Sequence, residues 1–579
     1  MVGPVTAAGP VVAAAAEAEL ALRVAAPELV DGFRAALPVA RDAVARRVIS
    51  AACWEGLTGP AEPAWSGERL FVPKAGGGYL VTRAVRHGFG RIEVTQPTEA
   101  DPVRLLADLV GEHPGVAAEI ADATVNLAIA LARRPHLALG DPDIDGGLDA
   151  DEQAAGLERL ATEGHNLHPC ARTRLGWRVP DVLAHDLEAA ATTVRFVAVH
   201  RDLHIGEDVG DHLGLAELGI RAPDPARFVL TPVHAWQFEQ VLRNRYADLI
   251  DDGTLVPLDD VALPAVPTAA LRTLLLPSAT GPPRYLKVSL DIQVTSTRRT
   301  ISVASTRNGP AISALLERLL ADDPECARVV LMTERAGSAV VASGGRRRDL
   351  AAIVRSGLSG RLHPDERVVP GGALYASSPR DGRPIVAEIV DRYGRTRRLT
   401  SAPDMALRFL DEYARLLLPP VLSLATRHGI GLEAHLQNCL PTFVGGVPHR
   451  LAVRDFAGLR IYPPRLPQPL RLWPGSVVVT GDVQVMRAKV AYTALQAHLG
   501  ELVVRLASSH QLGEVAAWAA VRGVIDEVYE RLRADPPLAR QARADHAFFV
   551  ADTVPHKALL TMRLRGGGEH YVAVGNPLR

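Results

Sequence analysis

Residues 429–461 hold the densest set of side chains that could do chemistry. The stretch GIGLEAHLQNCLPTFVGGVPHRLAVRDFAGLRI contains a Glu, a Gln and an Asn as well as His, Arg and Asp residues. Charges of both signs gathered in one place suit a site that binds phosphate together with a metal ion. The composition of this stretch therefore predicts a phosphate and metal site.

A β-hairpin is the element expected to position these groups. Two short runs, 431–443 and 449–456, flank the turn signal Gly445-Gly446. Side chains alternate across a strand, so three polar residues of the first run would share one face: Glu433, His435 and Gln437. A face made only for burial would carry Val, Ile or Leu. A solvated outer strand is the alternative interpretation.

Lysine is scarce in this chain. Of 64 basic residues only four are lysines: Lys74, Lys287, Lys489 and Lys557. Where arginine is so strongly preferred, a retained lysine marks a place that needs a compact ammonium, although drift leaves some by accident. Lys287 alternates with apolar residues in the run 285–300, which predicts a half-buried strand. A snorkelling edge residue is the alternative, but Thr295-Ser296 and Arg298-Arg299 at the end of the run favour a phosphate or carboxylate site.

A second basic loop, GHNLHPCARTRLG at 164–176, follows a helix predicted over 151–162. Its donors are His165, His168, Arg172 and Arg174. Several donors on one loop after a glycine-terminated helix make a cradle for an anion. Neutralisation of the helix dipole is the alternative interpretation.

Composition excludes some classes of function. The net charge of −1 and the isoelectric point near 7.1 argue against a general nucleic-acid binder. The four cysteines lie far apart, with no metal or disulfide spacing, as expected in a reducing cytoplasm. The order of charges at the N-terminus is wrong for a signal peptide, and no apolar run is long enough to cross a bilayer. The loop 140–147 carries spaced acids but lacks the closing Glu of an EF-hand, which predicts a solvated turn.

The 579 residues are too many for one hydrophobic core. Helices are expected over 13–50, over 404–427, over 482–508 and over 512–535, and two more between 102 and 134 that join near His113-Pro114-Gly115; a hairpin is expected over 69–82. We predict an α+β fold of three regions: a mainly helical region 1–150, a region 151–385 with the binding loops, and a region 386–579 with the hairpin and C-terminal helices.

These motifs, in this order, resemble the IucA/IucC family of siderophore synthetases, which act independently of multidomain peptide synthetases. That family shows a GHPxHPxxKxRxG loop, HPWQ, PTxSxRT, a strand lysine, TSxxR, and EAHxQN followed by RD. Here they stand as GHNLHPCARTRLG, HAWQ, PTAALRT, Lys287, Thr295-Ser296 to Arg299, EAHLQN and Arg454-Asp455. The resemblance runs from about residue 150 to near the C-terminus.

The resemblance implies a hand-like fold of thumb, fingers and palm with antiparallel sheets and helical bundles. It implies a cytoplasmic enzyme that uses ATP and Mg²⁺ to adenylate a carboxylate, most often citrate or a citryl derivative, and then condenses it with an amine or hydroxyl. Small-molecule substrates, with no nucleic acid and no membrane, are the implied partners, and a homodimer is left open. The acid, the nucleophile and the subtype of the family are left open as well.

The resemblance also implies residue roles. The residues implied to bind the ATP phosphates are Arg272, Thr273 and Lys287. Those implied to line the nucleotide are His435, Gln437, Asn438 and Asp455. The carboxylate substrate falls to His168, Thr295, Ser296, Arg299 and His435. Mg²⁺ falls to Glu433 or Asp455. The catalytic set is His168, Lys287, Arg299 and His435.

Three positions depart from the family pattern: Arg172 replaces a lysine, Ala235 a proline and Ala270 a serine. Loss of the serine hydroxyl removes one phosphate hydrogen bond, which contributes about 0.5–1.5 kcal/mol. Two alternatives follow. A small-molecule kinase is suggested by His435-x-x-Asn438 before Asp455-Phe-Ala-Gly458, although the Asp base ahead of the Asn is missing. A non-catalytic nucleotide- or siderophore-binding protein is suggested by Ala235 and Ala270.

Overall fold

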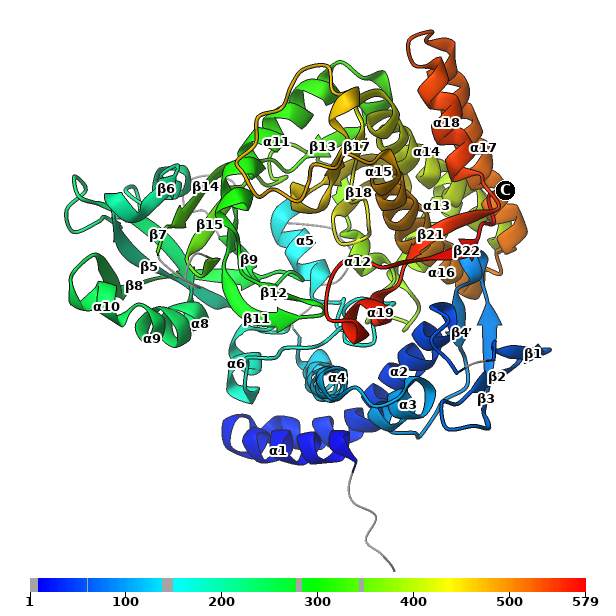
Figure 1. Cartoon of the computed structure of the whole chain (residues 1–579), viewed down its shortest axis with the longest axis horizontal. Coiled ribbons are helices and arrows are strands. Elements are labelled where there is room, and N and C mark those ends of the chain that lie inside the picture. The colour runs from blue at the N-terminus through cyan, green and yellow to red at the C-terminus, as the bar shows by residue number, and fades with distance from the viewer. Residues whose placement is uncertain (1–8, 60, 138–148, 277–283, 343–347) are drawn as a thin grey trace, which may run out of the picture.

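The computed structural model describes residues 9–59, 61–137, 149–276, 284–342 and 348–579. The acidic loop 140–147 lies outside the described residues. In Figure 1 the N-terminal helices lie along the bottom of the molecule, the large sheet lies at the left, and the C-terminal helices lie at the upper right. Mixed helices and mostly antiparallel sheets make this an α+β protein, as predicted.

The N-terminal region combines helices with a small antiparallel sheet in the order β1-β2-β3-β4. Its elements are α1 (Pro10–Ala25), α2 (Val30–Trp54), β1 (Ala64–Ser66), β2 (Arg69–Pro73), β3 (Tyr79–Arg86), β4 (Ile92–Val94), α3 (Pro102–Val110) and α4 (Pro114–Arg133). The predicted hairpin is β2–β3, whose turn uses Gly77 and Gly78 at positive φ. The helix break at His113 is confirmed as well.

Helix α4 corrects the prediction that no apolar run could cross a membrane. By length and composition the segment Pro114–His136 passes that test, and it is the one that does so in the described part of the chain. However, 72% of its apolar window is buried inside the protein. The helix packs against α1, α2 and α3, so its apolar surface serves a core.

The middle region is built on an eight-stranded antiparallel sheet in the order β6-β14-β15-β10-β9-β8-β5-β7. Its strands are β5 (Thr192–His200), β6 (His204–Gly206), β7 (Phe228–His234), β8 (Leu255–Pro267), β9 (Thr273–Leu276), β10 (Arg284–Val288), β14 (Glu334–Val340) and β15 (Ala351–Arg355). Other elements are β11 (Leu290–Val294), β12 (Thr297–Arg299), β13 (Val329–Leu331), β16 (Arg367–Val368), α5 (Ala150–Glu158), α6 (Val179–His185), α7 (Val209–Leu213), α8 (Ala235–Gln237), α9 (Arg243–Arg245), α10 (Ala247–Asp251), α11 (Val303–Ala321) and α12 (Gly371–Leu374).

The C-terminal region surrounds a four-stranded sheet in the order β13-β19-β18-β16, in which β13 runs parallel to β19. Its elements are α13 (Ile385–Arg397), α14 (Ala402–His428), β17 (Ile430–Gly431), β18 (Cys439–Val444), β19 (Val447–Val453), β20 (Arg460–Ile461), α15 (Val483–Val490), α16 (Gly500–His510), α17 (Glu514–Ala534), α18 (Ala539–Phe549), β21 (Thr553–Lys557), α19 (Leu559–Leu564) and β22 (Tyr571–Gly575). A π-helical stretch, Ala491–Leu499, joins α15 to α16. The predicted helices over 404–427, 482–508 and 512–535 are confirmed.

Hydrophobic cores cross the region boundaries predicted from the sequence. Apolar residues of α11, which lies in the predicted region 151–385, pack in the same core as α14 and α17. Leu290 and Ile292 of β11 pack in the core of the N-terminal helices. The division at 150 and 385 therefore stays a prediction about domains, while the packing joins the three regions.

The segment 553–575 returns to the centre of the molecule after the C-terminal helices (Figure 1). Strands β21 and β22 pair there, and α19 packs against α2. The carboxylate of Glu55 on α2 accepts hydrogen bonds from the backbone N–H groups of Leu560 and Thr561, at 2.9 and 2.7 Å. The Arg563 guanidinium pairs with Glu119 on α4 and donates to the Ser296 carbonyl at 2.9 Å. This segment thus connects the N-terminal helices with the β11–β12 turn.

Candidate active site

Lys287 lies on an interior strand rather than at an edge. Strand β10 pairs with β9 on one side and β15 on the other, which places Lys287 opposite Thr273 and Ile353. Its neighbours Leu286 and Val288 face an apolar core, so alternation sends the ammonium to the opposite face. The side chain is only 3% exposed. The strand prediction is confirmed, and the snorkelling alternative is wrong.

Asp455 forms an ion pair with the Lys287 ammonium. The Nζ atom lies 2.9 and 3.0 Å from the two carboxylate oxygens. Asp455 follows β19 with φ +63, a left-handed conformation that costs a non-glycine residue on the order of 1 kcal/mol or more. Burial opposes its ionisation, but Lys287 and Arg355 outweigh that effect and lower the pKa of the carboxyl. The chain is strained here to present a charged carboxylate.

Two residues that sequence reasoning missed complete this ion-pair network. Arg355 on β15 contacts Glu334 on β14 at 3.1 Å and Asp455 at 3.7 Å. Glu334 also lies 4.0 Å from the Lys287 ammonium. Both residues are buried in strands of mainly apolar composition. Only the pairing of β14, β15 and β10 brings them to Lys287, which no local pattern reveals.

Arg272 and Arg299 form a neighbouring cationic pair that is half-buried. Arg272 donates to the carbonyls of Arg299 and Thr300, both at 2.9 Å. Arg299 donates from Nη2 to the Thr295 hydroxyl at 3.1 Å. Within the described residues neither guanidinium contacts a carboxylate, and the buried Arg299 Nε has no partner. Removal from water and the positive charge of Arg272 lower the pKa of Arg299.

The hydroxyl of Thr273 is likewise buried without a hydrogen-bond partner. Buried polar groups are normally satisfied, so an unpaired donor beside two cations indicates a ligand that the protein alone does not supply. The charge of the surrounding groups decides the sign of that ligand. An anion fits Arg272, Thr273 and Arg299.

His168 and Ser296 meet beside this pair. The His168 Nε2 atom lies 2.8 Å from the Ser296 hydroxyl, while its Nδ1 accepts from the Cys170 N–H at 3.0 Å. The neutral ring therefore carries its proton on Nε2 and donates it to Ser296. Burial lowers the pKa of His168 well below its usual range, and the charge of Arg563 acts in the same direction. His168 is thus a neutral hydrogen-bond donor.

The predicted hairpin is β18–β19, with Gly445 and Gly446 both at positive φ in the turn. The prediction is wrong for residues 432–438, which form a loop between β17 and β18. Their backbone carbonyls bond to side chains of the π-helical stretch instead of to a strand. The Thr493 hydroxyl donates to the Leu432 carbonyl at 3.3 Å, and His498 Nδ1 donates to the Ala434 carbonyl at 2.9 Å.

Glu433 and His435 still come together on this loop, with 3.9 Å between the carboxylate and Nε2. Lys489 contacts Glu433 at 3.0 Å. Burial opposes ionisation of Glu433, but the nearby positive charge of Lys489 outweighs it and lowers the pKa. Burial lowers the pKa of His435 despite the nearby Glu433 and Asp455. A Cβ at Gly458 would lie 1.7 Å from a carboxylate oxygen of Glu433, so only glycine fits at position 458.

Gln437 does not share one strand face with Glu433 and His435, contrary to the prediction. The Gln437 side chain is exposed, and the backbone carbonyl of Gln437 accepts from the Arg454 guanidinium at 3.1 and 3.0 Å. Asn438 is buried and donates to the Glu433 carbonyl at 3.2 Å, which shapes the turn. Arg454 is tied to the turn and to Glu158, while Asp455 faces Lys287.

Three of the four lysines contact the carboxylates of Asp455, Glu433 and Glu569, and we call these lysines and carboxylates the polar centre. Lys489 and Lys557 both contact Glu569, at 3.3 and 3.1 Å, and Lys287 holds Asp455. Lys74 instead pairs with Asp108 on the surface. Sequence reasoning placed only Lys287 in the site, although the scarcity of lysine was a signal for Lys489 and Lys557 as well.

Loop 164–176 was predicted to cradle an anion with His165, His168, Arg172 and Arg174, and for the two arginines this prediction is wrong. Arg172 and Arg174 are buried and pair with the carboxylate of Asp186, at 3.0 and 2.9 Å. Arg172 also contacts Glu188 at 2.9 Å. Their charge is matched by carboxylates from a later part of the chain, so this pair holds the loop in place. Gln237 of the HAWQ motif is structural too, because it bridges the Asp349 carbonyl and the Asp291 N–H.

The chain is similar to known protein families over most of its length. Residues 153–376 match the model of the IucA/IucC family, and residues 407–572 match that of the ferric iron reductase FhuF-like transporter family. The D-ornithine–citrate ligase of Staphylococcus aureus is 25% identical over 464 residues, which cover 73% of this chain and 69% of that protein. A citryl-spermidine/3,4-dihydroxybenzoyl-citryl-spermidine:spermidine ligase of Bacillus anthracis is 28% identical, and the alignment covers 66% of each chain.

Solved structures share the fold over nearly the whole chain. The petrobactin biosynthesis protein AsbB of Bacillus anthracis matches with a TM-score of 0.78 and 23% identity, covering 95% of this chain and 98% of that one. The ATP-bound aerobactin synthetase IucA of Klebsiella pneumoniae matches with a TM-score of 0.75 and 18% identity, covering 93% and 99%.

Proposed function

We propose, because this chain belongs to the IucA/IucC family, that it is an ATP-dependent siderophore synthetase that joins a carboxylate to an amine or hydroxyl. The observation that carries the proposal is the pair Arg272 and Arg299, which no carboxylate of the described chain contacts, beside the buried unpaired hydroxyl of Thr273. An ordinary structural arginine in the same protein, such as Arg172, has its carboxylate. Citrate or a citryl derivative is the acid we propose first.

The proposed reaction has two steps that balance. A carboxylate oxygen of the acid attacks the α-phosphorus of ATP, forming an acyl adenylate and expelling pyrophosphate. The amine nitrogen then attacks the acyl carbon, the bond from that carbon to the AMP oxygen breaks, and the nitrogen loses a proton. The products are an amide, AMP and pyrophosphate. Both steps gain from fixed positive charge near the phosphates and from donors aimed at the acyl oxygen.

Within this proposal Arg272, Thr273 and Lys287 hold the phosphates. Lys287 is preorganised on an interior strand, and its partner Asp455 is half-buried, with 27% of its side chain exposed. His435, Gln437, Asn438 and Asp455 are proposed to line the nucleotide. Asn438 acts there through its turn, because its amide already donates to Glu433. Ala270 offers no hydroxyl, which leaves Thr273 as the side-chain hydroxyl of that loop toward phosphate.

The acid is proposed to bind to His168, Thr295, Ser296 and Arg299, with His435 near both substrates. Arg299 supplies charge, and His168 supplies an N–H that stays neutral because of its lowered pKa. Several donors and one fixed cation suit an acid with more than one carboxylate, or a carboxylate and a hydroxyl. The turn that carries Thr295 and Ser296 is held by Arg563.

Mg²⁺ is proposed to bind the carboxylate of Glu433 or that of Asp455, whose side chains are 22% and 27% exposed. No group of three or more His, Cys, Asp or Glu side chains suited to a metal occurs among the described residues. One or two carboxylates, completed by phosphate oxygens and water, are the usual ligands of Mg²⁺ in nucleotide sites. Bound there, the ion would neutralise triphosphate charge.

The test is a screen of pyrophosphate, AMP and ADP release with citrate, 2-oxoglutarate and succinyl monoamides, each with a panel of amines. We expect AMP and pyrophosphate with a polycarboxylate. Formation of ADP would instead support the kinase alternative, and no nucleotide turnover with any acid would support a binding protein. Turnover only with fatty acids or amino acids as the acid would contradict the polycarboxylate proposal.

A further inference from the structure

Helix α4 holds the loop that carries His168 at two points. The hydroxyl of Thr173 donates to the backbone carbonyl of Glu119 at 3.1 Å. One turn further along the helix, the carboxylate of Asp122 accepts from the backbone N–H of Arg174 at 2.6 Å. Thr173 is buried, so the first of these contacts lies in the protein interior. The end of this loop is therefore fixed to α4.

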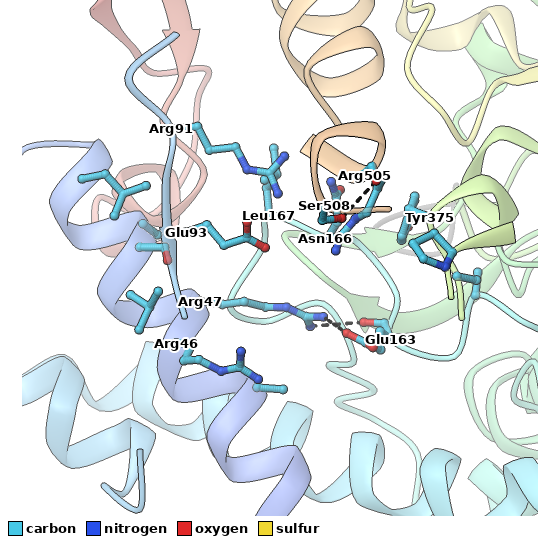
Figure 2. Close-up of a pocket in the computed structure, with 18 of the residues that line it drawn as sticks. Arg46, Arg47, Arg91, Glu93, Glu163, Asn166, Leu167, Tyr375, Arg505 and Ser508 are labelled. Atoms are coloured by element: carbon cyan, nitrogen blue, oxygen red, sulfur yellow. Dashed lines mark hydrogen bonds and ion pairs between the residues drawn. The ribbon is translucent and has the colours of Figure 1, made fainter. Parts of the chain in front are cut away.

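The beginning of the same loop has open space on one side. Figure 2 shows Asn166 and Leu167 at the edge of a cleft of about 390 Å³ between α2, β4 and α16. Asn166 donates to the carboxylate of Glu501 on α16. A segment that borders a cleft has fewer packing neighbours to hold it. The position of His168, the next residue along the chain, therefore depends on its hydrogen bonds.

The turn that contacts His168 is strained. Thr295 and Ser296 form this turn between β11 and β12. Thr295 has φ +55, a left-handed conformation that is unfavourable for a β-branched residue. Such a conformation persists only where the surrounding structure holds it. The backbone carbonyl of Ser296 accepts from Arg563 at 2.9 Å, so Arg563 is placed to hold the turn.

Arg563 reaches this turn from α19 and is itself fixed. Its guanidinium pairs with the carboxylate of Glu119, the residue whose backbone carbonyl holds Thr173. The Arg563 Nε atom lies 2.8 Å from that carboxylate. The two side chains are only 16% and 6% exposed, so salt and water screen the ion pair little. Glu119 thus anchors both the loop of His168 and the turn of Ser296.

These contacts close a ring of hydrogen bonds. The Nε2 atom of His168 lies 2.8 Å from the Ser296 hydroxyl, and Nδ1 accepts from the Cys170 N–H. The Cys170 carbonyl in turn accepts from the Thr173 N–H at 3.2 Å. In order, the members of this hydrogen-bond ring are Glu119, Arg563, Ser296, His168, Cys170 and Thr173. Satisfied polar networks rigidify the groups that they join.

The hydrogen-bond ring decides how Ser296 presents its hydroxyl. Because Nδ1 of His168 accepts a hydrogen bond, the neutral imidazole donates from Nε2 and the Ser296 oxygen accepts. The hydroxyl proton of Ser296 can then be donated to a carboxylate. Ser296 is half-buried, so a ligand can reach it.

We propose that Glu119 and Arg563 are positioning residues of the acid site. They close the hydrogen-bond ring and thereby fix Ser296 as a donor to the acid, although neither of them touches the acid. The inference rests on the proposed function and deepens it by naming residues that set acid binding from outside the site. It also makes acid binding depend on the docking of α19 against α4.

The test varies citrate and ATP in turn and follows pyrophosphate release; where another acid of the screen gives faster release, that acid replaces citrate. Arg563→Ala opens the hydrogen-bond ring and removes a donor from the strained turn. We expect KM for the acid to rise roughly 10-fold, because a displaced group binds less well, and KM for ATP to change less than about 2-fold. Glu119→Gln keeps one acceptor for Arg563, so KM for the acid should rise less.

Arg522→Ala is the matched control. Arg522 on α17 contacts both carboxylate oxygens of Asp526, at 2.8 and 2.9 Å, and donates to the Leu578 carbonyl at 2.6 Å. The substitution therefore removes the same kinds of contact as Arg563→Ala, but outside the hydrogen-bond ring. We expect this variant to keep the wild-type KM for both substrates, whatever stability it loses.

A double-mutant cycle locates the effect at Ser296. Because Arg563 is proposed to act through this hydroxyl, Arg563→Ala should raise KM for the acid roughly 10-fold in the wild-type background but less than about 3-fold in the Ser296→Ala background. Circular dichroism first establishes that each variant is folded. If Arg563→Ala does not fold, the same cycle is run with Glu119→Gln, which keeps the size of the original side chain.

Four outcomes would overturn the proposal. One is a wild-type KM for the acid in Arg563→Ala, or in Glu119→Gln where that variant replaces it, and another is an equal rise of both KM values. The third is the full rise in the Ser296→Ala background, and the fourth is the same rise in Arg522→Ala. Absence of pyrophosphate release by the wild-type enzyme with every acid would instead contradict the proposed function, so the two failures can be told apart.

Discussion

The pair Arg172 and Arg174 differs from the pair Arg272 and Arg299 in the groups that contact each guanidinium. The first pair is buried against the carboxylates of Asp186 and Glu188. The second pair is half-buried and contacts backbone carbonyls and a hydroxyl. Both pairs stand in motifs that the sequence assigned to ligand binding, yet only the second pair contacts no carboxylate among the described residues. The first pair therefore fixes the fold, and the second pair is the one proposed to bind a ligand.

The largest effect should come from breaking the matched pair. Asp186→Ala leaves two buried guanidinium groups with only Glu188, which should lower the free energy of unfolding by about 3–5 kcal/mol. Chemical denaturation measures the change, and the active fraction that remains folded should keep its KM for ATP and for the acid. A normal stability with a raised KM for either substrate would place Asp186 at the site and erase the contrast.

Lys287→Ala tests the ligand-facing side of the comparison. Loss of a preorganised ammonium should lower the rate of pyrophosphate release by roughly 100- to 1,000-fold. The fold should survive, because Arg355 still faces Asp455. Lys74→Ala, which removes the surface lysine, is the matched control and should keep the wild-type rate. Wild-type release by Lys287→Ala would make Lys287 a structural residue like Arg172.

Arg299→Ala should act on one substrate more than on the other. Its proposed partner is a substrate carboxylate, so KM for the acid should rise by roughly 10- to 100-fold, and KM for ATP by much less. Steady-state kinetics with each substrate varied in turn gives both values. Equal changes in the two constants would move Arg299 to the nucleotide, beside Arg272.

His87 represents a third arrangement, because it forms ion pairs with carboxylates only when its ring is protonated. Burial lowers its pKa, but Glu514 and Glu93 outweigh that effect and raise it from 6.5 to about 9. A raised pKa means that the ion pairs stabilise the fold fully below about pH 6.5 and lose this contribution as the pH rises through 9. His87→Gln should therefore cost on the order of 1 kcal/mol at pH 6, after screening at the partly exposed carboxylates, and little at pH 10. Thermal melts across that range check it, and an equal cost at both values would contradict it.

Local pattern predicted the parts of the site that depend on neighbours in sequence. The glycine pair at 445–446 predicted the hairpin turn, and alternation predicted the strand of Lys287. The polar alternation of Glu433 and His435 mimicked a strand, because the partners that make it a loop, Thr493 and His498, lie about 60 residues away. Arg172 cannot bind an anion because it pairs with Asp186, and no local pattern in the sequence predicts that ion pair.

The functional residues of buried strands were still harder to predict from the sequence. Arg355 sits in a run of apolar residues, and its contact with Asp455 arises only from the order of strands in the sheet and the docking of β19. The cleft was not foreseen either, because Arg91, Arg134 and Arg505 stand in three separate segments with no shared motif. Long-range docking, rather than composition, set these features.

The segment 553–575 has a consequence for protein synthesis. Arg563 holds the carbonyl of Ser296, a residue 267 positions earlier, and α19 is anchored by Glu55, about 500 positions earlier. A chain emerging from the ribosome folds its early parts first, at about 5–20 residues per second. The turn that we propose to bind the acid lacks its contact with Arg563 until residue 563 has emerged from the ribosome, so on this proposal a nascent chain cannot begin turnover early.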